Sequence, residues 1–220
     1  MKSRRPKSEQ RGDARHDLKA IEEVLQKPLL RGSPFDYAAR ARQVQEAQRW
    51  NRLASQLRFR PPADAHVWDV HRATAGRFYE AVEAAYPPGF WDDFQCLTRG
   101  EAKGMESAVR FLEADPYFFR SGYIKSRLIR CIKRPMLTPE YARRLQQVVL
   151  AVVEKRDDRD FRAFCRLAHK VGAPALREQL TQRLTNDDPN VRRRARWVLE
   201  ALEQNQPKGE QAINTRSVVT

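Results

Sequence analysis

The feature that most constrains the fold lies near the C-terminus, where a helix start precedes a run of arginines. Asp188 and Pro189 form that start, because an aspartate side chain can accept the free N–H groups of a first turn and proline needs no partner there. Val191 and Ala195 follow four residues apart, which places them on one helix face. Four of the five positions after Val191 are arginine. The segment therefore predicts a capped helix over 189–203 with one apolar face and a strongly basic surface.

The same kind of start recurs along the chain. Proline also follows Asp115, Thr138 and Ala173, and between these breakers the apolar residues repeat with a helical period. Asp115, Thr138 and Asp188 are expected to cap the helices that they precede, as are Ser33 and Asp64 earlier in the chain. The strand-like run 148–153 continues a helical pattern and is expected to be a buried helix. The sequence thus predicts an all-α fold, with helices at about 17–27, 34–59, 65–86, 90–97, 101–114, 117–134, 139–155, 158–171, 173–185 and 189–203.

The C-terminal pair of predicted helices resembles a HEAT-type repeat. In that family an aspartate closes the turn between paired helices, valine and alanine of the second helix pack inward, and an arginine follows the valine. The preceding helix fits the first position of such a pair, since Leu176, Leu180 and Leu184 lie at four-residue spacing. The resemblance covers about 173–203 and implies an irregular HEAT-like α-α superhelix of short antiparallel helix pairs; a plain helical bundle is the alternative. The residues that carry it are Asp188, Pro189, Val191, Arg192, Ala195 and Leu199.

Four segments are expected from these patterns. Residues 1–15 are basic and polar and are predicted to form a disordered tail. An N-terminal helical region follows over 16–114, and the HEAT-like repeat region extends over 115–204. Residues 205–220 are predicted to form a second disordered tail.

The charge of the chain favours a polyanionic partner. There are 42 Lys and Arg residues against 28 Asp and Glu residues, which gives a formal net charge of +14. Residues 61–100 are the exception, with three basic residues and six acidic ones, so the partner is expected to bind elsewhere. The basic N-terminus is not followed by an apolar run, and no stretch is apolar enough to span a membrane. We therefore expect a cytoplasmic protein without a membrane partner.

The positive charge is arranged in stripes on three alternate helices. On a helical wheel, arginines of 117–134 share a sector with Tyr123, and the basic residues of 158–171 form a single stripe. Alternate helices of a two-layer repeat array lie in the same layer, so the three stripes should line a shared concave groove. Tyr123 could stack on a base or could equally be buried, and a single charged stripe is also typical of any solvated helix. The predicted polyanion-binding residues are Tyr123, Arg127, Arg130, Arg134, Arg159, Arg162, Arg166, Lys170, Arg192 and Arg196.

Three functions fit this pattern. The favoured one is a non-enzymatic module that binds the phosphates of DNA or RNA. A second is an interaction scaffold for an acidic protein, and a third is an enzyme similar to the DNA glycosylases for alkylated purines, some of which are built from HEAT-like repeats. Residues of the types that such an enzyme needs are Trp68, Asp69, Trp91, Asp92 and Trp197.

Other chemistry has little support in the sequence. Cys96, Cys131 and Cys165 are far apart and form no CxxC pair, so buried free thiols are expected. His66 and His71 are five residues apart, a spacing that does not stack two metal ligands on a helix. We find no catalytic motif and therefore expect no metal and no cofactor. A non-enzymatic role is favoured, and the glycosylase-like enzyme stays open as the alternative.

Overall fold

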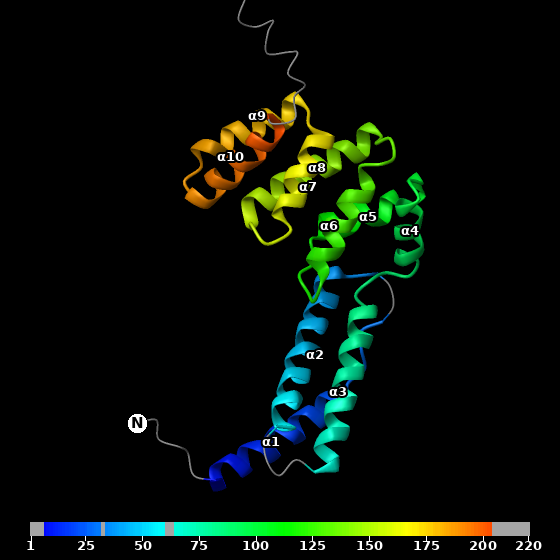
Figure 1. Cartoon of the computed structure of the whole chain (residues 1–220), viewed down its shortest axis with the longest axis vertical. Helices are drawn as coiled ribbons and strands as arrows, with labels where there is room; N and C mark the ends of the chain where they lie inside the picture. Colours follow the sequence, from blue (N-terminus) through cyan, green and yellow to red (C-terminus); the bar gives the residue numbers. More distant parts are fainter. Residues whose placement is uncertain (1–6, 32–33, 60–63, 204–220) are drawn as a thin grey trace, which may run out of the picture. The chain divides into compact units, whose positions relative to one another are not determined.

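The structure, a computed structural model, describes residues 7–31, 34–59 and 64–203. Every regular element within these ranges is a helix, so the predicted all-α fold is confirmed (Figure 1). The internal contacts divide the chain into two units. Unit 1 extends to Pro88 and also includes Pro116–Phe119, and unit 2 contains the remainder. Two helices that the sequence assigns to the region 16–114 therefore pack with the C-terminal helices.

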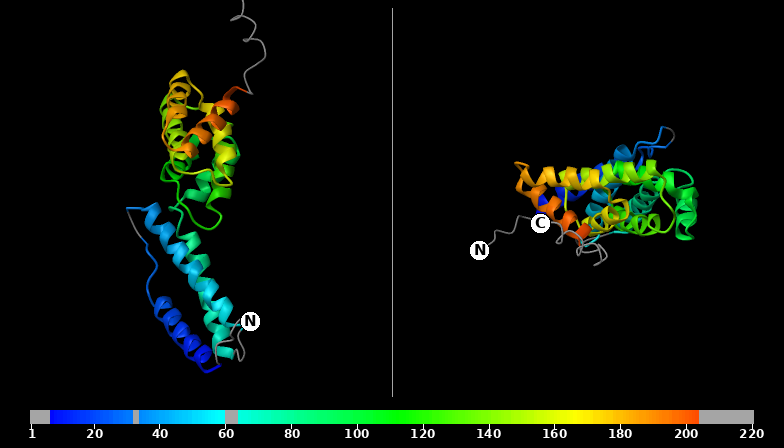
Figure 2. Two further views of the ribbon diagram at one scale, coloured as in Figure 1. Left: turned by 90° about the vertical axis from the view of Figure 1, so that its left-hand side faces the viewer. Right: turned by 90° about the horizontal axis from the view of Figure 1, so that it is seen from above.

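In its described residues, unit 1 contains three helices. They are α1 (Lys7–Leu25), α2 (Tyr37–Leu57) and α3 (Ala65–Glu83). The helices α2 and α3 lie side by side in Figure 1 and overlap in the left view of Figure 2, and their apolar faces enclose a core with α1. Ile21, Leu57 and Val70 are buried in this core.

The ends of the unit 1 helices differ in part from the predictions. Asp64 caps α3 as predicted, because its Oδ1 accepts the Val67 N–H at 3.1 Å. For α2, Asp36 is the capping residue, and the predicted Ser33 lies outside the described residues. The helix α1 begins at Lys7, inside the segment 1–15 for which the sequence predicts disorder. The remainder of that segment and the predicted tail 205–220 lie outside the described residues.

Unit 2 contains seven α-helices among the residues that the structure describes. Two short 3-10 helices also belong to this unit: η1 (Ala102–Gly104) directly precedes α5, and η2 (Arg183–Thr185) directly follows α9. The α-helices are α4 (Phe90–Thr98), α5 (Met105–Ala114), α6 (Ser121–Ile132), α7 (Pro139–Lys155), α8 (Phe161–Val171), α9 (Pro174–Gln182) and α10 (Pro189–Glu203).

The helices of unit 2 pack in pairs that form two rows. Consecutive helices pair as α5 with α6, α7 with α8, and α9 with α10 (Figure 1). Between pairs, α7 contacts both α5 and α9, while α8 contacts both α6 and α10. The α5–α7–α9 row and the α6–α8–α10 row therefore alternate along the chain. This arrangement places the three helices with predicted basic stripes next to one another.

Local capping signals explain where α7 and α10 begin. The Thr138 hydroxyl accepts the Tyr141 N–H at 3.3 Å, and Asp188 accepts the Asn190 N–H at 2.8 Å, as predicted. The predicted capping role of Asp115 is wrong. Asp115 ends α5 in the left-handed conformation, with φ of 42°, and its carboxylate binds two basic side chains from α6 and the end of α7. The next helix starts only at Ser121, because the chain leaves unit 2 over Pro116–Phe119.

Candidate nucleic-acid interface

The two rows of unit 2 differ sharply in charge. The α6–α8–α10 row carries ten basic side chains and only two carboxylates, both of them on α10. The α5–α7–α9 row carries five basic side chains and five carboxylates. Because helices of one row are neighbours, the excess positive charge of unit 2 is concentrated along α6, α8 and α10.

Two arginines of the α5–α7–α9 row, Arg110 and Arg144, are neutralised by carboxylates of the same row. Arg144 on α7 contacts Glu106 at 2.6 Å and Glu113 at 2.7 Å, both from α5. Hydrogen bonds to Glu113 and Glu106 raise the pKa of Arg144, and the bond from Arg144 lowers the pKa of Glu106. Arg110 pairs with Glu106 at 2.5 Å in the same way. Arg144 thus connects α7 to α5, Arg110 pairs within α5, and both have little charge left to offer a ligand.

Five predicted site residues of the α6–α8–α10 row are exposed cations. Within the described part of the chain they have no hydrogen bond, ion pair or aromatic partner. Three of them succeed one another at four-residue spacing along α8, so they lie on a single face of that helix. Their charge is available to an external anion. These five, called the unpaired cations below, are Arg130, Arg162, Arg166, Lys170 and Arg196.

Three other predicted site residues also contact the protein itself. The Arg127 guanidinium lies 4.9 Å from the centre of the Phe94 ring, and Arg134 donates to the Thr98 carbonyl oxygen. Arg192 donates to the carbonyl oxygens of Asn186 at 2.6 Å and Asp187 at 2.9 Å. Arg127 and Arg134 thus attach α4 to α6, and Arg192 fixes the turn before α10. None of these contacts involves a carboxylate, so all three residues keep their positive charge.

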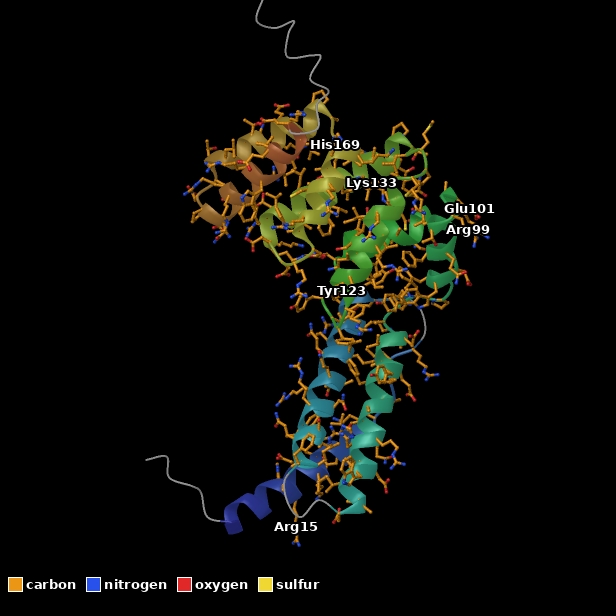
Figure 3. All side chains as sticks on the ribbon, in the orientation of Figure 1. Arg15, Arg99, Glu101, Tyr123, Lys133 and His169 are labelled. Carbon is orange, nitrogen blue, oxygen red and sulfur yellow. The ribbon has the colours of Figure 1, made fainter. Side chains whose placement is uncertain are left out.

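Tyr123 and Arg159 form a pair on the surface. Tyr123 is 58% exposed, near the start of α6, and its hydroxyl oxygen accepts a hydrogen bond of 2.9 Å from Arg159 Nη1 (Figure 3). The burial considered for this tyrosine is therefore excluded. Arg159 precedes α8, so the bond connects α6 to the segment that leads into α8.

Two residues of α10, Arg193 and Trp197, are absent from the predicted polyanion-binding set, and Trp197 was considered only for a glycosylase-like enzyme. Trp197 is 41% exposed and packs edge-to-face on Phe161 of α8, with ring centres 5.9 Å apart. The Arg193 guanidinium lies over the Trp197 ring at 5.2 Å and also pairs with Asp157 at 2.6 Å. The signal was the presence of tryptophan directly after an arginine run, which suggests stacking as well as charge.

A buried charge cluster holds the two rows together. Arg156 binds Asp115 at 2.5 Å and Asp160 at 2.5 Å, and Asp115 also binds Lys125 at 2.5 Å. Lys125 is only 1% exposed, and its burial lowers its pKa. Burial opposes ionisation of Asp115, but its bonds to Arg156 and Lys125 prevail and lower its pKa.

The geometry of the described residues does not favour a metal site, a reactive thiol or a glycosylase-type site. The described residues contain no cluster of His, Cys, Asp and Glu side chains that could hold a metal ion. Cys96 and Cys131 are buried as predicted, whereas Cys165 is half-buried; burial raises the pKa of its thiol to about 11. The glycosylase-type residues are dispersed. Trp68 and Asp69 are on α3 of unit 1, and the described helices α4 and α10, which carry the others, do not contact each other.

Comparisons with family models, with curated proteins and with solved structures give no match to this chain. The helices of the described residues are all too short or too polar to cross a membrane. The candidate interface therefore rests on its own geometry, which is a row of exposed cations on adjacent helices.

Proposed function

We propose that this protein is a non-enzymatic module that binds nucleic acid through the α6–α8–α10 row. The observation that carries the proposal is the contrast in pairing. Arg110 and Arg144 of the α5–α7–α9 row meet carboxylates, whereas the five unpaired cations of the neighbouring row meet none among the described residues. DNA and RNA are polyanions that are present in the cytoplasm, which is the location that the sequence predicts.

Phosphate is the ligand that best matches this surface. Four of the five unpaired cations are arginines, whose planar guanidinium group can donate two parallel hydrogen bonds to a phosphate. Spacing by helical turns suits a ligand that carries charges at regular intervals. Binding to the backbone alone would be largely independent of sequence, and its strength would fall steeply with salt concentration.

The test is a salt titration of binding to random-sequence DNA and RNA, compared between two triple variants. The first is Arg130→Gln, Arg162→Gln and Arg166→Gln, which removes three unpaired cations. Each lost phosphate contact lowers the slope of log affinity against log salt by roughly 0.7 to 0.9, so the slope should fall by about two to three. Affinity at about 0.1 M salt should fall about 100-fold or more.

The matched control is Lys103→Gln, Arg143→Gln and Lys155→Gln. These three cations are exposed, lie outside the α6–α8–α10 row, and change the net charge by the same amount. The control should retain nearly wild-type affinity and slope. Equal losses in both variants would mean that binding depends only on overall charge. If the wild-type protein binds no nucleic acid at low salt but binds an acidic polypeptide, the scaffold function replaces this proposal.

A further inference from the structure

Exposed aromatic side chains accompany the cations on two helices of the basic row, α6 and α10. Tyr123 and Trp197 are 58% and 41% exposed, although large aromatic side chains stabilise a folded protein most when they are buried. Both are held in place. Arg159 donates to the Tyr123 hydroxyl at 2.9 Å, and Phe161 supports one edge of the Trp197 ring at 5.9 Å. The rings are therefore exposed in fixed positions.

These contacts converge on the start of α8. Arg159 lies two residues before Phe161, so the segment that leads into α8 contacts Tyr123 of α6 and Trp197 of α10. Asp157 in the same segment pairs with Arg193, which lies over the Trp197 ring. The two exposed rings thus flank the beginning of one helix. We call Tyr123, Arg159, Phe161, Arg193 and Trp197 the aromatic platform.

Unpaired cations border this platform. Arg162 directly follows Phe161 on α8, and Arg196 directly precedes Trp197 on α10. A ligand whose charged backbone follows these arginines would bring its attached groups close to the rings. Single-stranded nucleic acid has this composition, with phosphates along a backbone and flat bases that are free to stack.

We infer that the α6–α8–α10 row selects single-stranded over duplex nucleic acid, with bases stacking on Trp197 and Tyr123. In a duplex the faces of the bases are covered by their neighbours, so exposed rings on the protein gain nothing from them. In a single strand each base can offer a face, and stacking on an aromatic side chain adds affinity with little dependence on sequence. This inference rests on the proposed function and specifies its substrate.

The experiment measures binding of a short oligothymidylate and of a random duplex of the same length. The wild-type protein should bind the single strand more tightly. Trp197→Ala should weaken single-strand binding on the order of tenfold, leave duplex binding unchanged and preserve the salt slope, because it removes stacking and no charge. Trp197→Phe should retain most of the affinity, since a flat ring remains.

Trp68→Ala is the matched control, because Trp68 is exposed to a similar extent, 46%, but lies on α3 of unit 1. It should bind like the wild type. Tryptophan fluorescence supplies a second readout that does not require the alanine variant to fold. Oligothymidylate should quench the wild-type emission, and the component contributed by Trp197 should be absent from Trp197→Phe.

The outcomes separate the two proposals. If duplex and single strand bind equally and Trp197→Ala has no effect, phosphate binding stands and the selection for single strands is overturned. If Trp197→Phe is quenched as strongly as the wild type, stacking on Trp197 is likewise overturned. If no nucleic acid binds at low salt, both proposals fail.

Discussion

The two rows of unit 2 consist of similar short helices, yet arginines in the two rows differ in whether a carboxylate lies beside them. In the α5–α7–α9 row, Arg144 sits between Glu106 and Glu113 and joins α7 to α5. In the α6–α8–α10 row, Arg162 and Arg166 extend from α8 without a carboxylate partner among the described residues. Arg144, with its carboxylate partners, joins two helices, whereas Arg162 and Arg166 keep their charge available to a ligand. Net charge alone therefore does not show which cations are available, and the pairing of each charge does.

The largest effect is expected where the two rows are joined. Asp115→Asn leaves Lys125 and Arg156 without their shared carboxylate, and a buried charge that loses its partner costs about 3–5 kcal/mol. Chemical denaturation should show a loss of that size in the free energy of unfolding. Asp158→Asn is the control, because Asp158 is exposed and lies 3.5 Å from Arg156; its expected cost is below about 1 kcal/mol. Equal costs would mean that the cluster does not hold the rows together.

The same cluster predicts how stability depends on pH. Because the pKa of Asp115 is lower in the folded protein than its ordinary value of 3.8, the stability that it contributes is present above that value. This contribution is lost as the pH falls through the lower, folded pKa. The difference in unfolding free energy between wild type and Asp115→Asn should therefore shrink as the pH is lowered below 3.8. Denaturation curves at a series of acidic pH values test this, and a constant difference would contradict it.

An intermediate effect is expected for a paired arginine of the α5–α7–α9 row. Arg144→Gln removes the cation between two carboxylates, and because the site is partly exposed the cost should be about 1–2 kcal/mol. Its neighbour Arg143 is exposed and has no hydrogen-bond or ion-pair partner among the described residues. Arg143→Gln should therefore change the unfolding free energy by less than about 0.5 kcal/mol. Thermal or urea denaturation of both variants makes the comparison. Indistinguishable variants would show that the pairing of Arg144 has no energetic consequence.

The smallest effect on stability is expected in the α6–α8–α10 row. Arg162→Gln combined with Arg166→Gln should leave the unfolding free energy within about 0.5 kcal/mol of wild type. At low salt the variant could only gain stability, since like charges on adjacent helices repel one another. A loss above about 1 kcal/mol would mean that these guanidinium groups have structural partners, and the contrast between the rows would disappear.

Much of the helical framework was predictable from short-range signals. Thr138 with Pro139 and Asp188 with Pro189 each begin a helix at the predicted residue. The run 148–153 belongs to α7, and all its residues except Ala151 are buried, because its apolar positions continue the period of one helix. Signals of this kind act within a single turn, so they operate before any tertiary contact forms.

The candidate interface was predictable only in part. The sequence placed basic stripes on alternate helices, and the structure makes those helices neighbours. It did not reveal that Arg127 and Arg134 also attach α4, or that Arg193 covers Trp197. The contacts of Arg127 and Arg134 join different helices and no local pattern specifies them, whereas Arg193 and Trp197 lie four residues apart on α10.

Asp115 shows most clearly where the sequence reaches its limit. An aspartate before proline is an ordinary helix start, and at Asp188 that reading is correct. At Asp115 the carboxylate instead binds Lys125 and Arg156, the latter 41 residues further along the chain. The sequence by itself determined that the chain forms short capped helices with an excess of arginine, because backbone capping and helical periodicity are local. The tertiary structure alone decided which of those arginines are neutralised, because neutralisation depends on which carboxylates the packing of the helices brings within a few ångströms.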